Sequence, residues 1–209
     1  MKQIIEKLEL RLSQALPGQD AHQLVMSYAR PSYQEIPPAE IEKYRQSAVM
    51  VLFYPHEKEW KLVLILRPTY PGVHSAQVSF PGGKLEPEDS SPEAGALRET
   101  NEEVGVEPKH VQILGRLSKV IIPPSQFIVT PVVGFLDYRP NFVPDPREVA
   151  SIIEYPLVHL LDKAAIGRTK IEVASRNLKM DVGYFDAQGQ TVWGATAMML
   201  AELRALLLD

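Results

Sequence analysis

The stretch that decides the fold is Gly82-Gly83-Lys84-Leu85-Glu86-Pro87-Glu88-Asp89, followed by Leu97-Arg98-Glu99-Thr100-Asn101-Glu102-Glu103-Val104-Gly105-Val106. Ser91 and Pro92, which lie between the two parts, are typical of the first positions of a helix. Gly105 is typical of a position just past a helix end. The pattern therefore predicts a glycine-rich turn followed by a helix that runs from about residue 92 to residue 104.

The predicted helix carries three carboxylates on one face. Glu102 and Glu103 lie three and four residues after Glu99, so the three side chains share one small volume. They repel one another and lie in the last turns, where the helix dipole favours cations. A solvated acidic face is the alternative interpretation. The position directly after a glycine-rich turn favours a metal site for Mg²⁺ or Mn²⁺, which prefer oxygen ligands and bridge to phosphates.

Two neighbours of the carboxylates complete the predicted site. The turn at Gly82 and Gly83 permits a close approach of the backbone, so the carbonyl group of Gly82 is a further candidate metal ligand. Arg98 keeps its proton under all ordinary conditions and has a planar fork of donors. We expect it to hold one of the glutamates through a bidentate pair.

The rest of the chain alternates between strand-like and helical patterns. Apolar positions predict an N-terminal helix at 4–16, a short helix after Asp20 and a last helix at 194–207. Strand-like runs occur at 48–54, 61–66, 77–80, 111–117 and 129–136, and 149–153 is ambiguous. This order predicts an α+β fold with a mixed sheet between helices. Residues 1–40 are expected to form a helical appendage, and residues 41–209 one domain.

Composition excludes several classes of protein. The 209 residues have a net charge of −4 and include no cysteine, which removes disulfides, thiolate metal sites and cysteine nucleophiles. A nucleic-acid partner is not expected, because no basic stripe is visible. The N-terminal region is charged too early for a signal segment, and the apolar run at 198–208 contains Glu202 and Arg204. We therefore expect a cytoplasmic protein that does not enter a membrane; a homo-oligomer is left open.

The deciding stretch resembles the Nudix box, G-x5-E-x7-R-E-U-x-E-E-x-G-U, in which U is aliphatic. The residues on fixed positions of the box are Gly83, Arg98, Glu99, Glu102, Glu103, Gly105 and Val106. Asp89 replaces the first glutamate, one extra residue precedes Arg98, and Thr100 replaces an aliphatic residue. The resemblance implies a Nudix α/β/α sandwich, with Glu99 and Glu103 as metal ligands. Glu102 would be a further ligand or take part in activating water.

The first two departures are similar to the coenzyme A pyrophosphatase branch of the family. That likeness extends to Arg67, His74 and residues 77–83, and further along to 129–134, 148–149, 156–157 and 192–196. The chain departs from the branch at Pro68, Gly72 and Ala76, where the branch has serine, arginine and glycine. The resemblance covers most of residues 47–207.

The resemblance implies hydrolysis of the diphosphate bond of coenzyme A or its thioesters, giving 3′,5′-ADP and phosphopantetheine. The catalytic candidates are Arg98, Glu102 and Glu148; the candidates for binding this small-molecule diphosphate substrate are Arg67, His74 and Lys84, with Lys119 as a fourth cation. His74 and Glu148 are also compatible with plain surface roles. The alternatives are a Nudix pyrophosphatase for ADP-ribose or another nucleoside diphosphate derivative, and a non-catalytic nucleotide-binding module. Such a module would be expected to lack one of the three glutamates or Arg98, and all four are present.

Overall fold

The computed structural model describes residues 2–26, 32–71, 74–173 and 178–208. Gly72, one of the departures noted above, lies outside the described residues. The helices are α1 (Lys2–Leu12), α2 (Gly18–Gln23), α3 (Pro38–Ile41), α4 (Pro92–Val104), α5 (Leu157–Leu161) and α6 (Gly194–Leu208), with 3-10 turns η1 (Tyr33–Glu35) and η2 (Pro108–His110). The strands are β1 (Arg45–His56), β2 (Glu59–Leu66), β3 (Val78–Ser79), β4 (Gly82–Lys84), β5 (Gln112–Arg116), β6 (Val120–Ile122), β7 (Phe127–Phe135), β8 (Ser151–Pro156), β9 (Gly167–Val173), β10 (Leu178–Ala187) and β11 (Gln190–Val192).

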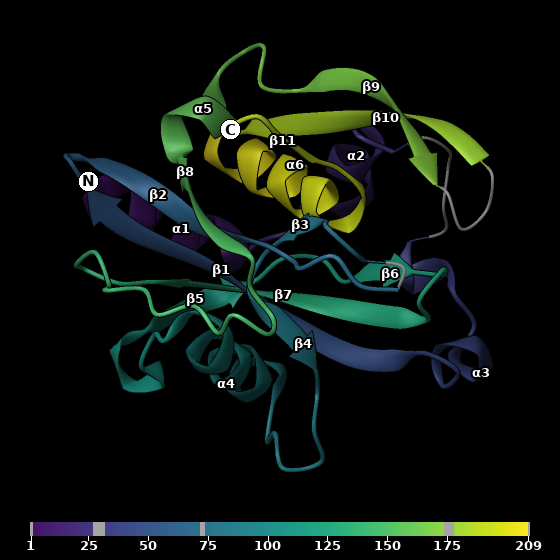
Figure 1. Ribbon diagram of the computed structural model, residues 1–209, viewed down its shortest axis with the longest axis horizontal. Helices are drawn as coiled ribbons and strands as arrows, with labels where there is room; N and C mark the ends of the chain where they lie inside the picture. Colours follow the sequence, from purple (N-terminus) through teal and green to yellow (C-terminus); the bar gives the residue numbers. More distant parts are fainter. Residues whose placement is uncertain (1, 27–31, 72–73, 174–177, 209) are drawn as a thin grey trace.

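A mixed sheet of eight strands forms the centre of the molecule (Figure 1). Strand β1 is its axis: it is antiparallel to β2 and β4 and parallel to β7. Strands β3 and β8 extend the sheet beyond β2, while β5 and β6 pair with β7. The unbroken apolar run at 48–54 suits this central place, because a strand covered on both faces needs no polar alternation. The predicted α+β class with a mixed sheet is confirmed.

Alternate side chains of β1 belong to two separate cores. Ala48, Met50 and Leu52 pack with residues of α4, whereas Val51 and Phe53 pack with residues of α6. Successive side chains of a strand point to opposite faces, so one apolar strand supplies both layers. Figure 1 shows the result, with α4 below the sheet and α6 above it. The sheet is therefore the middle layer of an α/β/α sandwich.

The ends of α4 are formed by the residues that predicted them. The Ser91 side chain accepts a hydrogen bond from the backbone N–H of Ala94 at 3.2 Å. Gly105 adopts φ of 73°, and its N–H donates to the Asn101 carbonyl at 2.9 Å. A left-handed residue at this place favours glycine, and it stops the helix directly after Glu103 and Val104.

The N-terminal helices share the main core. Ile5 and Leu8 of α1, and Val25 after α2, belong to the same buried cluster as the apolar residues of α6. Lys7 Nζ donates to the Leu207 carbonyl at 2.9 Å, which ties α1 to the end of α6. Residues 2–26 thus cover one face of the sheet together with α6. The boundary near residue 40 stays a prediction.

A second sheet, with the order β11-β10-β9, packs over α6 (Figure 1). Phe185 and Val192 bury their side chains in the core that includes α6. The sequence interpretation missed this sheet and the short strands β4 and β6. It also left residues 149–153 ambiguous; of these, 151–153 belong to strand β8, which continues to Pro156. Strand β9 has no continuous apolar run, because every second residue is exposed and charged: Arg168, Lys170 and Glu172. This explains why the strand was missed.

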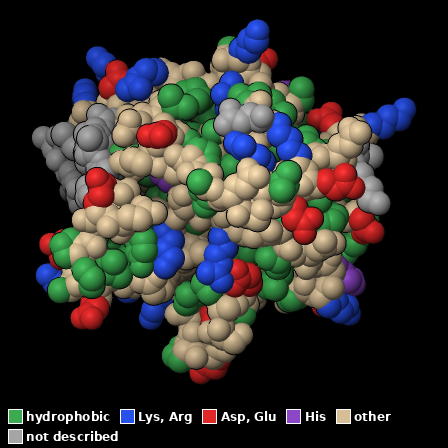
Figure 2. Space-filling model, turned by 180° about the vertical axis from the view of Figure 1, so that it is seen from behind, with side chains coloured by type: hydrophobic (Ala, Val, Ile, Leu, Met, Phe, Trp, Pro, Cys, Tyr) green, Lys and Arg blue, Asp and Glu red, His purple; other side chains and the backbone are tan. Residues whose placement is uncertain are grey.

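The surface mixes charges of both signs. Figure 2 shows one face, on which basic and acidic side chains are interspersed with apolar and uncharged ones. In the part of the chain that the structure describes, no helix combines the length and the apolar character needed to cross a membrane.

Candidate active site

Helix α4 places its three glutamates at three depths. The side chain of Glu103 is 1% exposed, that of Glu99 is 14% exposed, and that of Glu102 is 52% exposed. The same helical face therefore runs from the protein interior to the solvent. The two deeper carboxylates are enclosed by the protein, and the outer one is exposed to solvent, where it can meet a water molecule or a substrate.

Glu103 is a buried carboxylate with one oxygen bound and one oxygen without a hydrogen bond. Its Oε2 accepts from the backbone N–H of Gly82 at 2.8 Å. Its Oε1 is buried and makes no hydrogen bond; Arg67 Nη1 lies 3.6 Å away, which is too far for one. Burial raises the pKa of Glu103 to about 7, against the opposing effects of the Gly82 N–H and Arg67. A bound cation would relieve this burial of charge.

Glu99 lies against the glycine turn. A Cβ atom at Gly83 would lie 2.5 Å from the Glu99 carboxylate, so a side chain there would displace it. Partial burial raises the pKa of Glu99, and the neighbouring Arg98 opposes the rise. Gly83 is thus the residue that allows the turn and this carboxylate to touch.

Gly82 is required for a different reason. Its φ is 150°, and a Cβ atom would lie 2.4 Å from the Ala48 carbonyl oxygen of strand β1. Only glycine combines this backbone conformation with such a close approach. The turn is therefore pressed against the central strand, which brings the Gly82 N–H to Glu103. Whether the Gly82 carbonyl binds a metal stays a prediction.

Arg98 joins the turn to the carboxylates. Its Nε and Nη2 donate to the two oxygens of Asp89 at 3.1 and 2.9 Å, and its Nη1 donates to Glu99 at 2.9 Å and to Glu102 at 3.2 Å. Nη2 also reaches the Lys84 carbonyl at 3.2 Å. The sequence suggested that Arg98 forms a bidentate pair with one of the glutamates. In the structure its bidentate partner is Asp89. The hydrogen bonds from Arg98 lower the pKa of Asp89, which keeps the pair charged.

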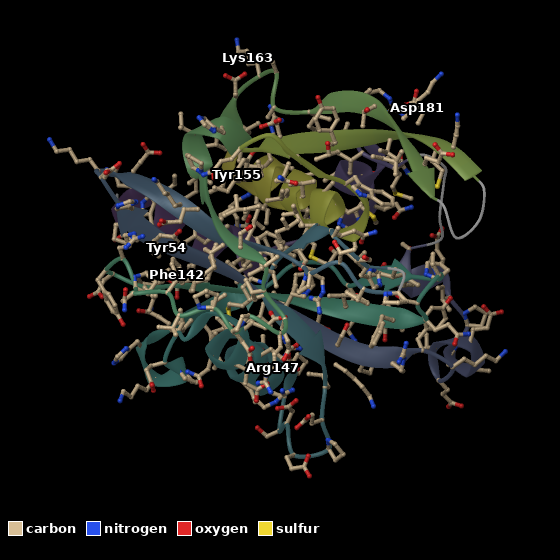
Figure 3. All side chains as sticks on the ribbon, viewed as in Figure 1. Tyr54, Phe142, Arg147, Tyr155, Lys163 and Asp181 are labelled. Carbon is tan, nitrogen blue, oxygen red and sulfur yellow. The ribbon has the colours of Figure 1, made fainter. Side chains whose placement is uncertain are left out.

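Glu148 follows the Pro-rich loop after β7, the place for which the sequence made it a candidate carboxylate near the metal. The N–H groups of Val143 and Asp145 donate to the carbonyls of Val104 and Glu103, both at 3.0 Å, so this loop closes over the end of α4. Figure 3 places Arg147 beside α4. The charge of Glu148 contributes to the raised pKa values of both Glu99 and Glu103. Backbone contacts of this kind leave no side-chain signal, so the sequence did not show how the loop reaches the end of α4.

The loop is also anchored to the sheet, on the same face as α4. The rings of Tyr54 and Phe142, which are labelled next to each other in Figure 3, pack edge to face with centroids 5.3 Å apart. Tyr54 belongs to β1 and Phe142 precedes the Val143–Asp145 contacts. Phe142 is thus fixed to the sheet, and Val143 and Asp145 are fixed to the end of α4.

The predicted substrate-binding residues lie in different places. Arg67 follows β2 and faces Glu103. Lys84 ends β4, directly beside the turn. His74 Nδ1 lies 3.1 Å from Gln77 Oε1, in the loop before β3. Lys119 lies far from the turn, because it precedes β6. Strand β6 is separated from β4, the strand of the turn, by β7 and β1. Three strand spacings, roughly 14 Å, separate it from the glycine turn.

The carboxylates are compatible with a metal ion but do not enclose one. Among the described residues, no three His, Asp or Glu side chains are grouped so that they could hold an ion as they stand. Two of the three glutamates, Glu99 and Glu102, accept hydrogen bonds from Arg98. The unbound buried oxygen of Glu103 and the desolvated Glu99 carboxylate are still the hard oxygen donors that Mg²⁺ or Mn²⁺ prefers. The donor set fits such an ion.

Comparisons with known proteins agree with this geometry. The family model of the NUDIX domain matches residues 43–171. A protein of Pectobacterium atrosepticum named as a Nudix hydrolase, NudL, is 34% identical over 181 residues, which cover 84% of this chain and 90% of that protein. Its namesake in Yersinia enterocolitica is 30% identical and covers 92% of this chain and 97% of that protein.

A solved structure shows the same fold. The MutT/nudix family protein from Enterococcus faecalis superimposes with a TM-score of 0.55 at 16% identity, covering 87% of this chain and 66% of that one. Sandwich, glycine turn and glutamate helix together define a Nudix-type domain. The family model covers more than half of the chain, and this chain belongs to the Nudix hydrolases, which act on diphosphate bonds. Members of this family generally use divalent metal ions.

Proposed function

We propose that this enzyme hydrolyses the diphosphate bond of coenzyme A or its thioesters, giving 3′,5′-ADP and phosphopantetheine, with Mg²⁺ or Mn²⁺. The observation that carries the proposal is the bidentate pair between Arg98 and Asp89. Asp89 and its longer spacer are the departures shared with the coenzyme A pyrophosphatase branch. The pair gives this departure a physical role, since the same arginine orients Glu99 and Glu102.

Each site residue has a distinct role in this proposal. Glu99, Glu103 and the Gly82 carbonyl would hold the metal, and a divalent ion there would neutralise charge on the diphosphate and help to activate water. The Gly82 N–H fixes the orientation of Glu103, and Arg98 fixes that of Glu99. Glu102, which is half exposed, is either a further ligand or the base that takes the proton from water; Glu148 is the second candidate base.

The loop before β3 supports the branch assignment. Ala76 stands where the branch has glycine, and its φ of 53° is in the left-handed region that favours glycine. Its N–H donates to the Pro68 carbonyl at 3.1 Å, which closes the loop. The backbone thus keeps a glycine-like conformation although the side chain has changed.

The extra phosphate of coenzyme A requires a cation near the adenosine end. Arg67 faces Glu103 and Lys84 lies beside the turn, while His74, in the loop before β3, stays a candidate. Lys119 is too distant for this purpose if the diphosphate lies at Gly83, because a ribose ring does not span three strand spacings. Of the four cations that the sequence offered for this phosphate, three therefore remain.

A substrate panel tests the proposal. We expect kcat/KM for coenzyme A to exceed that for dephospho-coenzyme A by about tenfold to a hundredfold, since a charge-assisted contact contributes about 1.5–3 kcal/mol. ADP-ribose should be a poorer substrate under identical Mg²⁺ and Mn²⁺ concentrations. If ADP-ribose is preferred, or coenzyme A is not cleaved, the changes at Pro68, Gly72 and Ala76 have redirected the substrate pocket.

A further inference from the structure

A cavity of about 390 Å³ lies at the edge of the main sheet, between α2, η1 and β6. Its volume is in the range of small-molecule sites. Val120, one of its lining residues, is in register with Val129, Ser47 and Lys84 across β7, β1 and β4. The cavity is therefore roughly 14 Å from the glycine turn, and it is distinct from the glutamate site.

A buried carboxylate holds two walls of this cavity together. Glu202 of α6 is completely buried and lies 2.9 Å from His22 Nε2. It accepts from Ser118 Oγ at 2.7 Å, from the Ser118 N–H at 3.1 Å and from the Gly18 N–H at 3.3 Å. Gly18, His22 and Ser118 all line the cavity. Burying a charge is costly unless it is fully hydrogen-bonded, so this arrangement fixes the walls in one geometry.

The cavity has a cation and an apolar side. Lys119 Nζ lies 4.5 Å from the centre of the Tyr33 ring and 3.5 Å from its hydroxyl oxygen. Among the described residues that line the cavity, Lys119 carries a positive charge and none is acidic. Val120 and Met198 supply apolar surface. A negative group would find a fixed ammonium ion here, and a short apolar body would find a place beside it.

We propose that this cavity is a second ligand site that binds a small anionic metabolite. Its phosphate monoester or carboxylate group contacts Lys119, and its apolar part packs against Val120 and Met198. The helix α2 and the turn η1 build this site, which gives the segment before residue 41 a role in binding. The site needs neither the glutamates of α4 nor a metal ion.

Titrations of the full chain with three probes, inorganic phosphate, phenyl phosphate and benzoate, test this site at constant ionic strength. The backbone amide signals of Gly18, Ser118 and Lys119 are followed by NMR, first with Mg²⁺ and then with EDTA. We expect saturable shifts at these amides in both conditions. Phenyl phosphate and benzoate each carry a phenyl ring and differ in their anionic group. The one with the lower dissociation constant therefore identifies the preferred anion.

Variants of Lys119 test whether the cavity binds an anion or whether its walls, held by Glu202, are only structural. Lys119→Gln should weaken binding at least about tenfold, the loss of one charge-assisted contact, while Lys119→Arg should keep it. Lys109→Gln, a change of an exposed lysine in η2, is the matched control and should bind like the wild type. The proposal is wrong if no probe saturates, if Lys119→Gln binds equally well, or if only Gly82 and Gly83 amides respond.

Discussion

At Glu103 the protein keeps a carboxylate almost entirely out of solvent. One oxygen is bound by the Gly82 N–H at 2.8 Å, while the other faces Arg67 at 3.6 Å without a hydrogen bond. Such a group is costly unless something positive completes it. The hydrogen bond to Oε2 fixes the orientation of the side chain, and the unbound Oε1 is the atom at which a cation would bind.

Glu103→Gln should lower kcat with Mg²⁺ by at least about a hundredfold, because it removes a charged metal ligand without removing volume. The amide oxygen of glutamine can still accept from Gly82, and no buried charge remains, so the melting temperature should not fall. Glu107→Gln, at an exposed position after α4, is the control. Near wild-type turnover of Glu103→Gln would remove Glu103 from the metal site.

At the scale of elements, α4 is held in place by two bidentate arginine pairs. Arg98 connects it to the loop that carries Asp89, and Arg116 of β5 binds Glu93 in its first turn through Nε and Nη2. Both pairs fix the helix. Only Arg98 also contacts Glu99 and Glu102, so the two positions separate anchoring of the helix from orientation of the carboxylates.

Arg98→Lys should lower kcat/KM by about ten- to a hundredfold, because lysine keeps the charge but loses the planar fork. Arg116→Lys loses an equivalent fork and should change activity little. Circular dichroism and melting temperatures should show both variants folded. Equal activity of the two variants would mean that Arg98 acts only through general surface charge.

Local signals predicted α4, while distant pairing remained hidden. Ser91, Pro92 and Gly105 define the helix by contacts within one or two turns, so the sequence was sufficient there. The partner of Arg98 was misjudged because Asp89 reaches it only when the loop folds back on the helix. The hairpin of β9 and β10 was missed because its exposed strand alternates charges, and its buried side depends on α6.

At the scale of the whole molecule, Glu202 joins three segments that are distant in sequence. From its place in α6 it binds Gly18 and His22, both in α2, and Ser118, the residue before Lys119. In the sequence this glutamate was only an interruption of an apolar run. Burial disfavours its charge, yet the hydrogen bonds from His22 and Ser118 outweigh that effect and lower its pKa.

Glu202→Gln should reduce the free energy of unfolding at pH 7 by about 2–4 kcal/mol, since it removes a charge that buried donors require. A lowered folded pKa means that the stabilisation is present above the ordinary value of 4.5 and is lost as the pH falls through the folded value. The difference between wild type and variant should therefore narrow on the acid side of 4.5 in urea titrations. Glu6→Gln, at an exposed position of α1, is the control. If the difference in the free energy of unfolding stays constant with pH, the shape of the Glu202 side chain matters and its charge does not.

The packing of α1 against α6 has a consequence for synthesis on the ribosome. Lys7 contacts Leu207 across a separation of 200 residues, and β1 must wait for β7 before its parallel partner exists. One face of the sheet stays open until residues 194–208 have been translated, on the order of ten seconds after β7 at about 5–20 residues per second. During that interval the nascent chain exposes the apolar surface that α6 later covers, so chaperone binding is expected to concentrate there.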